Sequence, residues 1–205
     1  MAGEHVQFRS GKRRQTEERI IAAAADLFLE HGCRATTVRG IAKAAEVSIG
    51  RVMSVGDKDE ILVRCFDRWI GQLQDGTHSP PPLRRADRPR TASAVQQHLL
   101  EIFLPFLEFF AAHEDLSRDC AAAMMRVRGD PEVFSALAND LQRRLSQSLI
   151  EIGISENDAR ASAAGLYDAY LGILFRWAAT TMTLTEATDS LLEVIAVHTR
   201  VRSPL

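Results

Sequence analysis

Apolar residues recur along this chain with the spacing of α-helices and do not alternate as in β-strands, so the pattern predicts an all-α fold of about nine helices. Residues 16–58 divide into three short helices. The first helix has one apolar stripe, formed by Ile20, Ala24, Leu27 and Phe28. Gly32 follows this stripe and suits the left-handed conformation that ends many helices, so we expect the first helix to stop there.

The next two predicted helices are joined by a turn of three residues, Glu46, Val47 and Ser48. Thr37 can cap the second helix, whose apolar face is formed by Val38, Ile41, Ala42 and Ala45. Ser48 can cap a third helix that runs from Ile49 to about Ser54. Two helices joined in this way have the geometry of a helix-turn-helix motif, whose second helix enters the DNA major groove. The third helix is therefore the predicted DNA reader.

The rest of the pattern predicts six further helices and one long loop. Asp57 and Glu60 have the spacing of a capping box, so a fourth helix begins near Lys58 and connects the reader to the rest of the chain. Residues 79–90 contain four prolines and favour a loop. The other helices are predicted over residues 93–112, 115–128, 131–152, 156–182 and 185–200.

The motifs of the N-terminal region resemble those of the TetR family of bacterial transcriptional regulators. They are Thr36-Thr37-Val38, Ile41-Ala42, Val47-Ser48-Ile49-Gly50 and Lys58. This resemblance implies a DNA-binding domain over residues 1–58 and an effector-binding and dimerisation domain over residues 59–205. It also implies a repressor that a small molecule releases from DNA.

The sequence departs from the family pattern at three places. Cys33, Met53 and Val55 stand where the family usually has aromatic residues, and the segment between Gly50 and Lys58 is one residue shorter. The Tyr that is usual at the position of Met53 donates a hydrogen bond to a phosphate, which a thioether cannot do. We therefore expect an altered operator preference.

Composition excludes several other classes of protein. The chain is 46% apolar, which is ample for a buried core, and it has neither an apolar run of membrane-spanning length nor an apolar leader, so we expect a cytoplasmic protein. Its three cysteines have no paired spacing and are expected to be reduced packing residues. Its six histidines show no metal-ligand spacing, and no phosphate loop, nucleophile elbow or dinucleotide fingerprint occurs. We expect no metal, no cofactor and no enzymatic activity.

Charge is distributed unevenly and favours a nucleic-acid partner for the N-terminal region. Residues 1–58 have a net charge of +3 and residues 59–205 a net charge of −5. A basic arm precedes the first helix and can meet phosphates, although a solvated tail is the alternative. The predicted contacts with double-stranded DNA are Lys12, Arg13, Arg14, Thr37, Ser48, Ile49, Arg51, Met53, Ser54 and Lys58. Arg51 is the best candidate to read a base, because arginine donates two hydrogen bonds to guanine.

The C-terminal helices carry candidates for binding a small-molecule effector that is largely apolar. Pro105 interrupts a very apolar helix and can leave a gap beside it. The candidate lining residues are Phe103, Phe106, Phe110, Met124, Tyr167, Tyr170 and Trp177, and ordinary core packing is the alternative for each of them. Polar candidates for orienting an effector are His98, His113, Arg126, Asp168 and Arg176, which could instead be exposed or paired locally.

The last two predicted helices carry candidates for a homodimer interface. Gly165, Ala169 and Gly172 form a stripe of small residues, and Leu191 and Ile195 lie on one face of the last helix. Packing of the stripe within the same chain is the alternative. A two-fold dimer would read an operator of two inverted half-sites. A helical small-molecule-binding protein with a degenerate DNA reader is the other function that the sequence leaves open.

Overall fold

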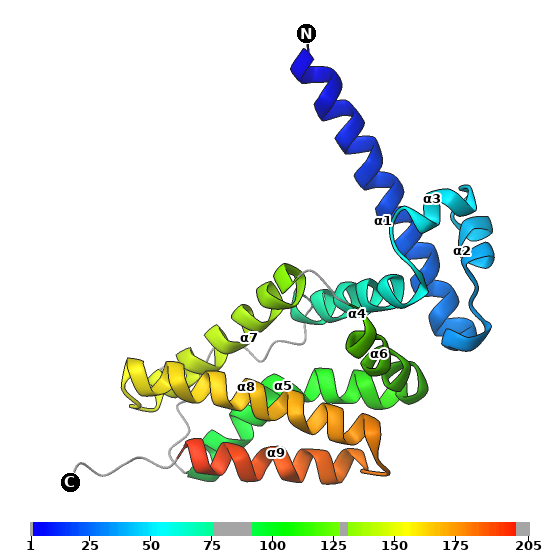
Figure 1. Cartoon of the computed structure of the whole chain (residues 1–205). Helices are drawn as coiled ribbons and strands as arrows, with labels where there is room; N and C mark the ends of the chain where they lie inside the picture. Colours follow the sequence, from blue (N-terminus) through cyan, green and yellow to red (C-terminus); the bar gives the residue numbers. More distant parts are fainter. Residues whose placement is uncertain (1, 76–91, 128–130, 200–205) are drawn as a thin grey trace. The chain divides into compact units, whose positions relative to one another are not determined.

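The structure is a computed structural model that describes residues 2–75, 92–127 and 131–199 (Figure 1). Within these residues the chain forms nine helices and no strand, which confirms the predicted all-α fold. The helices are α1 (Ala2–Ala35), α2 (Val38–Ala44), α3 (Ile49–Met53), α4 (Lys58–Asp75), α5 (Ala92–Ala112), α6 (Glu114–Arg126), α7 (Pro131–Glu151), α8 (Glu156–Ala179) and α9 (Leu184–His198). The predicted loop over residues 79–90 lies outside the described residues.

Helix α1 begins much earlier than the sequence pattern indicated. It starts at Ala2, so the expectation that Lys12, Arg13 and Arg14 form an arm ahead of the first helix was wrong. The physical reason is that arginine, lysine and glutamine are good helix formers, and no proline interrupts this segment. Gly32 has a left-handed φ of 75°, which confirms the predicted break near the end of α1.

The chain packs as two compact units. One unit contains residues Met1–Trp69 and Asp115–Gly129, and the other contains Ile70–Glu114 and Asp130–Leu205. The packing therefore divides the chain differently from the predicted boundary at residue 58, because most of α4 and nearly all of α6 belong to the first unit. The predicted division by function, into a DNA-binding and an effector-binding domain, stays a prediction.

The first unit has a core in which α1 supplies the central surface. Helix α1 packs on α2, and α2 packs on α3. Helix α4 joins α1 through the Cys65 thiol, which donates to the carbonyl oxygen of Ile21 at 3.6 Å. The completely or nearly completely buried side chains here include Ile20, Ala24, Phe28, Ile41, Val52, Ile61, Leu62, Cys65 and Phe66. The first two predicted helices are thus buried along the apolar faces that the sequence pattern identified, and α3 is anchored by Val52, which the pattern did not single out.

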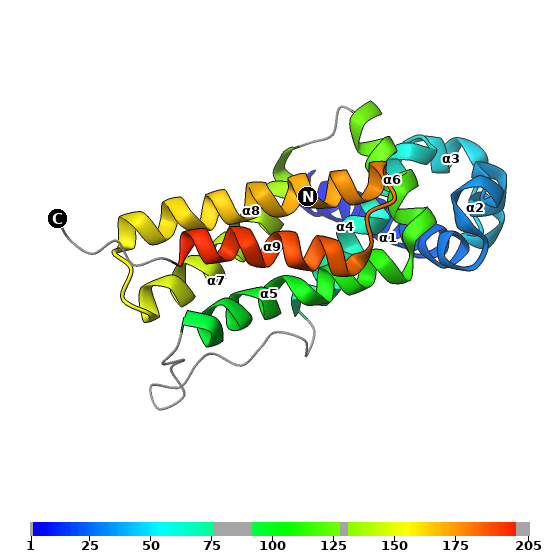
Figure 2. The ribbon, with the colours of Figure 1, turned by 90° about the horizontal axis from the view of Figure 1, so that it is seen from below.

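The second unit is a bundle of four helices. Helix α7 packs on α8, α8 on α9, α9 on α5, and α5 on α7, so the four close into a ring, and Figure 2 shows α8 and α9 side by side. Phe103 and Tyr170 lie in the core, with their ring centroids 5.0 Å apart. The side chains with no exposed surface include Phe103, Leu145, Leu149, Leu166, Leu191 and Ile195.

Helix α5 is the apolar helix predicted around Pro105. It continues through Pro105 from Ala92 to Ala112. Leu99, Phe103 and Leu107 are almost fully buried, since α5 packs against both α7 and α9. Among the described helices, none combines the length and the apolarity that crossing a membrane requires.

Candidate nucleic-acid interface

The turn between α2 and α3 depends on one residue in a left-handed conformation. Glu46 has a φ of 52°, which is unusual for a residue with a Cβ. The backbone N–H of Glu46 donates to the carbonyl of Lys43 at 3.2 Å, and that of Val47 donates to the carbonyl of Ala42 at 3.0 Å. These hydrogen bonds close the end of α2 and turn the chain into α3 within three residues, as the sequence predicted.

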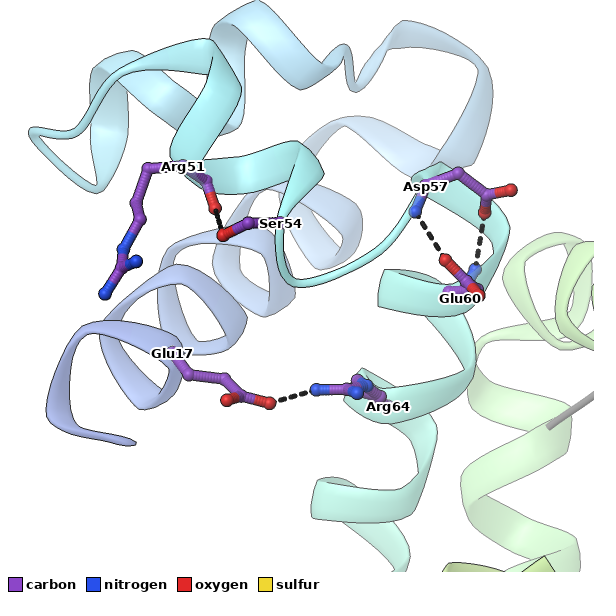
Figure 3. A network of polar contacts seen from close by, with 6 residues as sticks. All are labelled: Glu17, Arg51, Ser54, Asp57, Glu60 and Arg64. Atoms are coloured by element: carbon purple, nitrogen blue, oxygen red, sulfur yellow. Dashed lines mark hydrogen bonds and ion pairs between the residues drawn. The ribbon is translucent and has the colours of Figure 1, made fainter. Parts of the chain in front are cut away.

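Both ends of α3 are capped by serine side chains. The Ser48 hydroxyl accepts from the backbone N–H of Arg51 at 3.2 Å. The Ser54 hydroxyl donates to the carbonyl of Arg51 at 2.8 Å (Figure 3). The predicted N-cap at Ser48 is therefore confirmed. The Ser48 hydroxyl keeps its proton for an outside acceptor, whereas the Ser54 proton is already committed to the backbone.

Helix α3 has one buried anchor and an exposed outer face. Val52 is completely buried, while Ile49 and Met53 are 45% and 51% exposed. The Arg51 side chain points away from α3, and its guanidinium forms no hydrogen bond or ion pair with the described residues (Figure 3). A fixed helix thus presents one free cation and two apolar side chains to the surroundings.

The start of α2 is fixed by two adjacent threonines. The buried Thr36 hydroxyl donates towards the carbonyl oxygens of Gly32 at 2.8 Å and Leu27 at 3.1 Å, which ties α2 to the end of α1. The Thr37 hydroxyl accepts from the N–H of Gly40 at 3.0 Å, so the predicted cap of α2 is confirmed.

Two cations on α2 were missed in the sequence analysis. Arg39 and Lys43 are both exposed and lie one helical turn apart, opposite the buried Ile41 and Ala42. Their i, i+4 spacing on the polar face of the first helix of the motif was a usable signal, because this helix crosses the DNA backbone in helix-turn-helix proteins. We add both residues to the candidate phosphate contacts.

The basic residues of α1 are exposed, as a phosphate contact requires. Lys12, Arg13 and Arg14 lie on the helix surface, and Arg14 is 3.9 Å from Glu18 in an exposed i, i+4 pair. A helical segment holds these charges at a fixed spacing, which a flexible arm would not do. Their contact with DNA stays a prediction.

The start of α4 is connected to the reader by a capping box. The Asp57 N–H donates to Glu60 Oε2 at 2.7 Å, and the Glu60 N–H donates to Asp57 Oδ1 at 2.9 Å, which confirms the predicted arrangement (Figure 3). Gly56 is required just before this box, since a Cβ there would lie 2.8 Å from the Cβ of Glu60. Arg64 of α4 also pairs with Glu17 of α1, so the helix leaving the reader is held to the first helix.

Lys58 has a more enclosed position than its predicted phosphate contact suggested. Its side chain is partly buried, and its charge lies near enough to the Cys33 thiol at the end of α1 to act on the pKa of that thiol. Burial nevertheless raises the pKa of Cys33 above its ordinary value, with Lys58 opposing the rise. A phosphate contact by Lys58 stays a prediction.

Helix α6 brings an acid–base pair and a third thiol to the same unit. Arg126 Nε lies 2.7 Å from Asp59 Oδ2, and its hydrogen bond lowers the pKa of Asp59. Burial raises the pKa of Cys65 to about 12 and raises that of Cys120 as well. These two thiols are buried packing groups that stay protonated at neutral pH. Among the described residues, no group of three or more His, Cys, Asp or Glu is placed to hold a metal ion.

The predicted effector-binding residues fall into two sets. Phe103, Phe106, Tyr170 and Trp177 are buried in the core of the four-helix unit, with Phe110 and Tyr167 partly buried against it. Met124 lies on α6, which belongs to the other unit. Burial is compatible both with core packing and with the wall of a binding site, so their role stays a prediction.

Three of the predicted polar candidates have local partners. Arg126 pairs with Asp59, and an Arg176 nitrogen donates to the Ser190 hydroxyl at 3.0 Å. His98 lies between α5 and α7, with its Nε2 atom 3.4 Å from the Ser148 hydroxyl oxygen. These contacts favour the alternative of local pairing.

The predicted dimer residues need correction. Leu191 and Ile195 have no exposed surface and belong to the core of their own chain, so their assignment to a dimer interface was wrong. A Cβ on Gly165 would lie 3.0 Å from Cε1 of His198, so this glycine permits α8 and α9 to approach within one chain. Gly172 is exposed and Ala169 partly exposed, and their place in an interface stays a prediction.

These elements define a helix-turn-helix motif whose second helix, α3, is capped at both ends. The comparison with protein families agrees, because residues 20–52 match the family described as bacterial regulatory proteins, tetR family. This match begins at residue 20, inside α1, and runs through α2 to the buried Val52 of α3. A match of this length shows that the helix-turn-helix region resembles that of TetR-family regulators.

Solved structures share the fold over most of the chain. Thermus thermophilus FadR, a TetR-family repressor in complex with lauroyl-CoA, is 24% identical, with 92% of this chain and 97% of that chain covered and a TM-score of 0.61. A transcriptional regulator from Rhodococcus sp. is 24% identical, with 88% and 94% covered and a TM-score of 0.56. Bacillus subtilis FadR in complex with stearoyl-CoA is 20% identical, with 87% and 97% covered and a TM-score of 0.52. No curated protein sequence matches the chain.

Proposed function

We propose that this chain is a TetR-family regulator, a dimeric repressor that binds an inverted-repeat operator through α3 and leaves it when a small apolar effector binds. The main support for the proposal is the structure of α3, which is capped by Ser48 and Ser54 and anchored by the buried Val52. Its Arg51 guanidinium has no hydrogen-bond or ion-pair partner within the part of the chain that the structure describes. A rigid helix with a free bidentate donor is what direct reading of a base edge requires.

Arg51 is the residue that we expect to specify a base. Its five N–H donors match the two acceptors of guanine in the major groove, and such a pair contributes roughly 1–3 kcal/mol of discrimination. Arg39, Lys43 and the α1 cations Lys12, Arg13 and Arg14 are exposed and suit the phosphates instead. Phosphate contacts position a protein on the duplex without selecting sequence.

The test is a selection of bound sequences from random duplexes with the full chain, followed by binding titrations at several salt concentrations. Arg51→Ala should lower affinity for the selected duplex by roughly 1–3 kcal/mol and relax preference at one base pair per half-site. The control Arg39→Ala should weaken binding to all duplexes by the same factor. It should also reduce the slope of log affinity against log salt concentration by about the amount of one phosphate contact. Failure to prefer any duplex over scrambled competitor at low ionic strength would favour the small-molecule-binding protein with a degenerate reader.

The proposed dimer uses the outer surface of α8 and α9. Gly172 is exposed on α8, and the apolar Val197 is 61% exposed on α9. A two-fold arrangement would place two copies of α3 about 34–36 Å apart or somewhat more, matching two half-sites. Sedimentation velocity tests it: Val197→Glu should shift the chain to monomer, whereas Ile150→Glu, at an exposed apolar position on α7, should leave the mass unchanged.

The proposed effector binds the four-helix unit of α5, α7, α8 and α9. This unit contains the aromatic residues Phe103, Phe106, Tyr170 and Trp177, which provide apolar contact surface. The FadR structures of similar fold are complexes with lauroyl-CoA and stearoyl-CoA, so an acyl-CoA is the first effector class to test. An effector releases DNA only if it binds the DNA-free conformation more tightly.

The effector test is a titration of the DNA complex with lauroyl-CoA, with coenzyme A lacking the acyl chain as control. Release by the acylated compound alone supports an apolar site in this unit. The reciprocal measurement must agree, since the operator has to weaken acyl-CoA binding by the same factor. Binding of lauroyl-CoA with no change in operator affinity would contradict its role as effector.

A further inference from the structure

Helix α3 exposes more apolar surface than its packing requires. Six large apolar side chains are highly exposed among the described residues, and two of them, Ile49 and Met53, belong to this helix of five residues. They are four positions apart and so share one face of the helix. The packing of α3 against its own unit is already supplied by Val52, which has no exposed surface.

The positions around the helix axis define two flanks. Because successive residues turn by about 100°, the direction opposite the buried Val52 is close to that of Gly50. Arg51 lies on one flank of Gly50, and Ile49 and Met53 lie on the other. A Cβ on Gly50 would meet nothing within 4 Å, so the centre of the exposed face is flat and open. The helix axis can therefore approach a partner closely, with a cation on one side and two apolar groups on the other.

The chemistry of the major groove has one apolar feature that matches this second flank. Base edges there present hydrogen-bond donors and acceptors, and thymine alone adds a methyl group. Neither the isoleucine side chain nor the methionine thioether donates a hydrogen bond, so contact with a thymine methyl is the base-specific interaction open to both.

Resting on the proposed function, we propose that Ile49 and Met53 are specificity-determining residues that select thymine methyl groups on one side of the base pair read by Arg51. The occupant of this apolar flank is thus the DNA itself. Exposed cations on the same motif, Arg39 and Lys43 on α2, support a polyanion as the partner of this surface. The Met53 thioether then supplies base readout at a place where it cannot bind a phosphate through a hydrogen bond.

The test replaces single thymines of the selected duplex by deoxyuridine, which removes the methyl and leaves every hydrogen-bonding group in place. Loss of one buried methyl contact corresponds to about a fourfold weakening of binding. We expect that penalty at one or two thymines in each half-site. Thymines outside these positions serve as the internal control.

Protein variants identify which side chains cause the penalty. Ile49→Ala and Met53→Ala should each reduce the ratio of thymine to uracil affinity towards one at a contacted position, with thermal stability nearly unchanged because both side chains are exposed. Leu29→Ala, which removes an apolar side chain of 42% exposure from α1, should leave that ratio as in the unaltered chain. Arg51→Ala should also keep the uracil penalty while it loses the guanine preference.

The outcomes separate this inference from the proposed function. Selective binding with no uracil penalty at any thymine, or a penalty that persists in both alanine variants, overturns the methyl readout and leaves the regulator intact. Absence of selective binding to any duplex overturns both.

Discussion

Glu46 shows how one residue limits the stability of the DNA reader. Its backbone is left-handed, with a φ of 52°, in the turn between α2 and α3. For a residue with a Cβ this conformation costs roughly 1–2 kcal/mol, because the Cβ lies close to the following carbonyl oxygen. The Glu46 side chain is exposed, so packing does not explain why glutamate stands there.

We expect Glu46→Gly to raise the free energy of unfolding by about 0.5–1 kcal/mol. Glycine avoids the left-handed cost, although its greater freedom in the unfolded chain offsets part of the gain. Chemical denaturation measures the change. The matched control is Glu46→Ala, which removes the same carboxylate but keeps the Cβ, so an equal gain in that variant would refute the backbone explanation.

At the scale of elements, α4 begins after a turn that is stabilised by residues close to it in the sequence. The capping box of Asp57 and Glu60 satisfies two backbone N–H groups at its first turn, and Gly56 leaves room for the Glu60 side chain. The chain therefore passes from the DNA reader into α4 through a defined turn.

Removal of the cap should weaken this turn. Asp57→Ala is expected to lower the free energy of unfolding by about 1 kcal/mol, because the N–H of Glu60 loses its acceptor. Asp57→Ser, which keeps an oxygen at the N-cap, should stay near the unaltered chain. Urea unfolding compares the three proteins, and equal stability of all three would show that the box contributes nothing.

The contact between α6 and α4 should depend on pH. The hydrogen bond from Arg126 lowers the pKa of Asp59 below the ordinary 3.8, so this carboxylate stabilises the folded chain above that pH and the contribution is lost as the pH falls through the lowered pKa. The stability difference between the unaltered chain and Arg126→Gln should thus be largest near neutral pH and shrink below about pH 4. A difference that is constant from pH 7 to pH 3 would contradict the ion pair. The Arg126 side chain is 59% exposed and the Asp59 side chain 30% exposed, so solvent screens the pair and the effect is small.

At the scale of the whole molecule, the ring of α5, α7, α8 and α9 holds much of the buried apolar surface. Leu191 lies inside this ring with no exposed surface. Leu191→Ala should lower the free energy of unfolding by about 2–5 kcal/mol, because truncation leaves a cavity in a packed core.

Sedimentation distinguishes this role from an interface role. Folded Leu191→Ala should keep the oligomeric state of the unaltered chain. The control Glu193→Ala, at an exposed position of α9, should also keep that state and should change the free energy of unfolding by no more than about 0.5 kcal/mol. Dissociation of Leu191→Ala without loss of stability would restore the interface assignment that the burial of this residue contradicts.

The N-terminal site was largely predictable because its signals are local. Thr37, Ser48 and the pair Asp57 and Glu60 each stand a few residues from the backbone groups that they cap, so spacing alone identified them. Arg51 was singled out because arginine can donate two hydrogen bonds to guanine, and its role as a base reader stays a prediction. The helical course of the residues before Thr16 escaped prediction, since that segment has no apolar stripe to mark it.

What the sequence determined by itself is therefore the set of helices, the caps of α2, α3 and α4, and the helix-turn-helix motif, because hydrogen bonds and apolar periodicity act over a few residues. Only the tertiary structure decided that Leu191 and Ile195 face the core of their own chain, that α6 pairs with α4 through Arg126, and that Gly165 meets His198. An apolar stripe predicts that a helix face is buried. The helix that packs on this face is determined by contacts between residues far apart along the chain, and a local pattern does not predict such contacts.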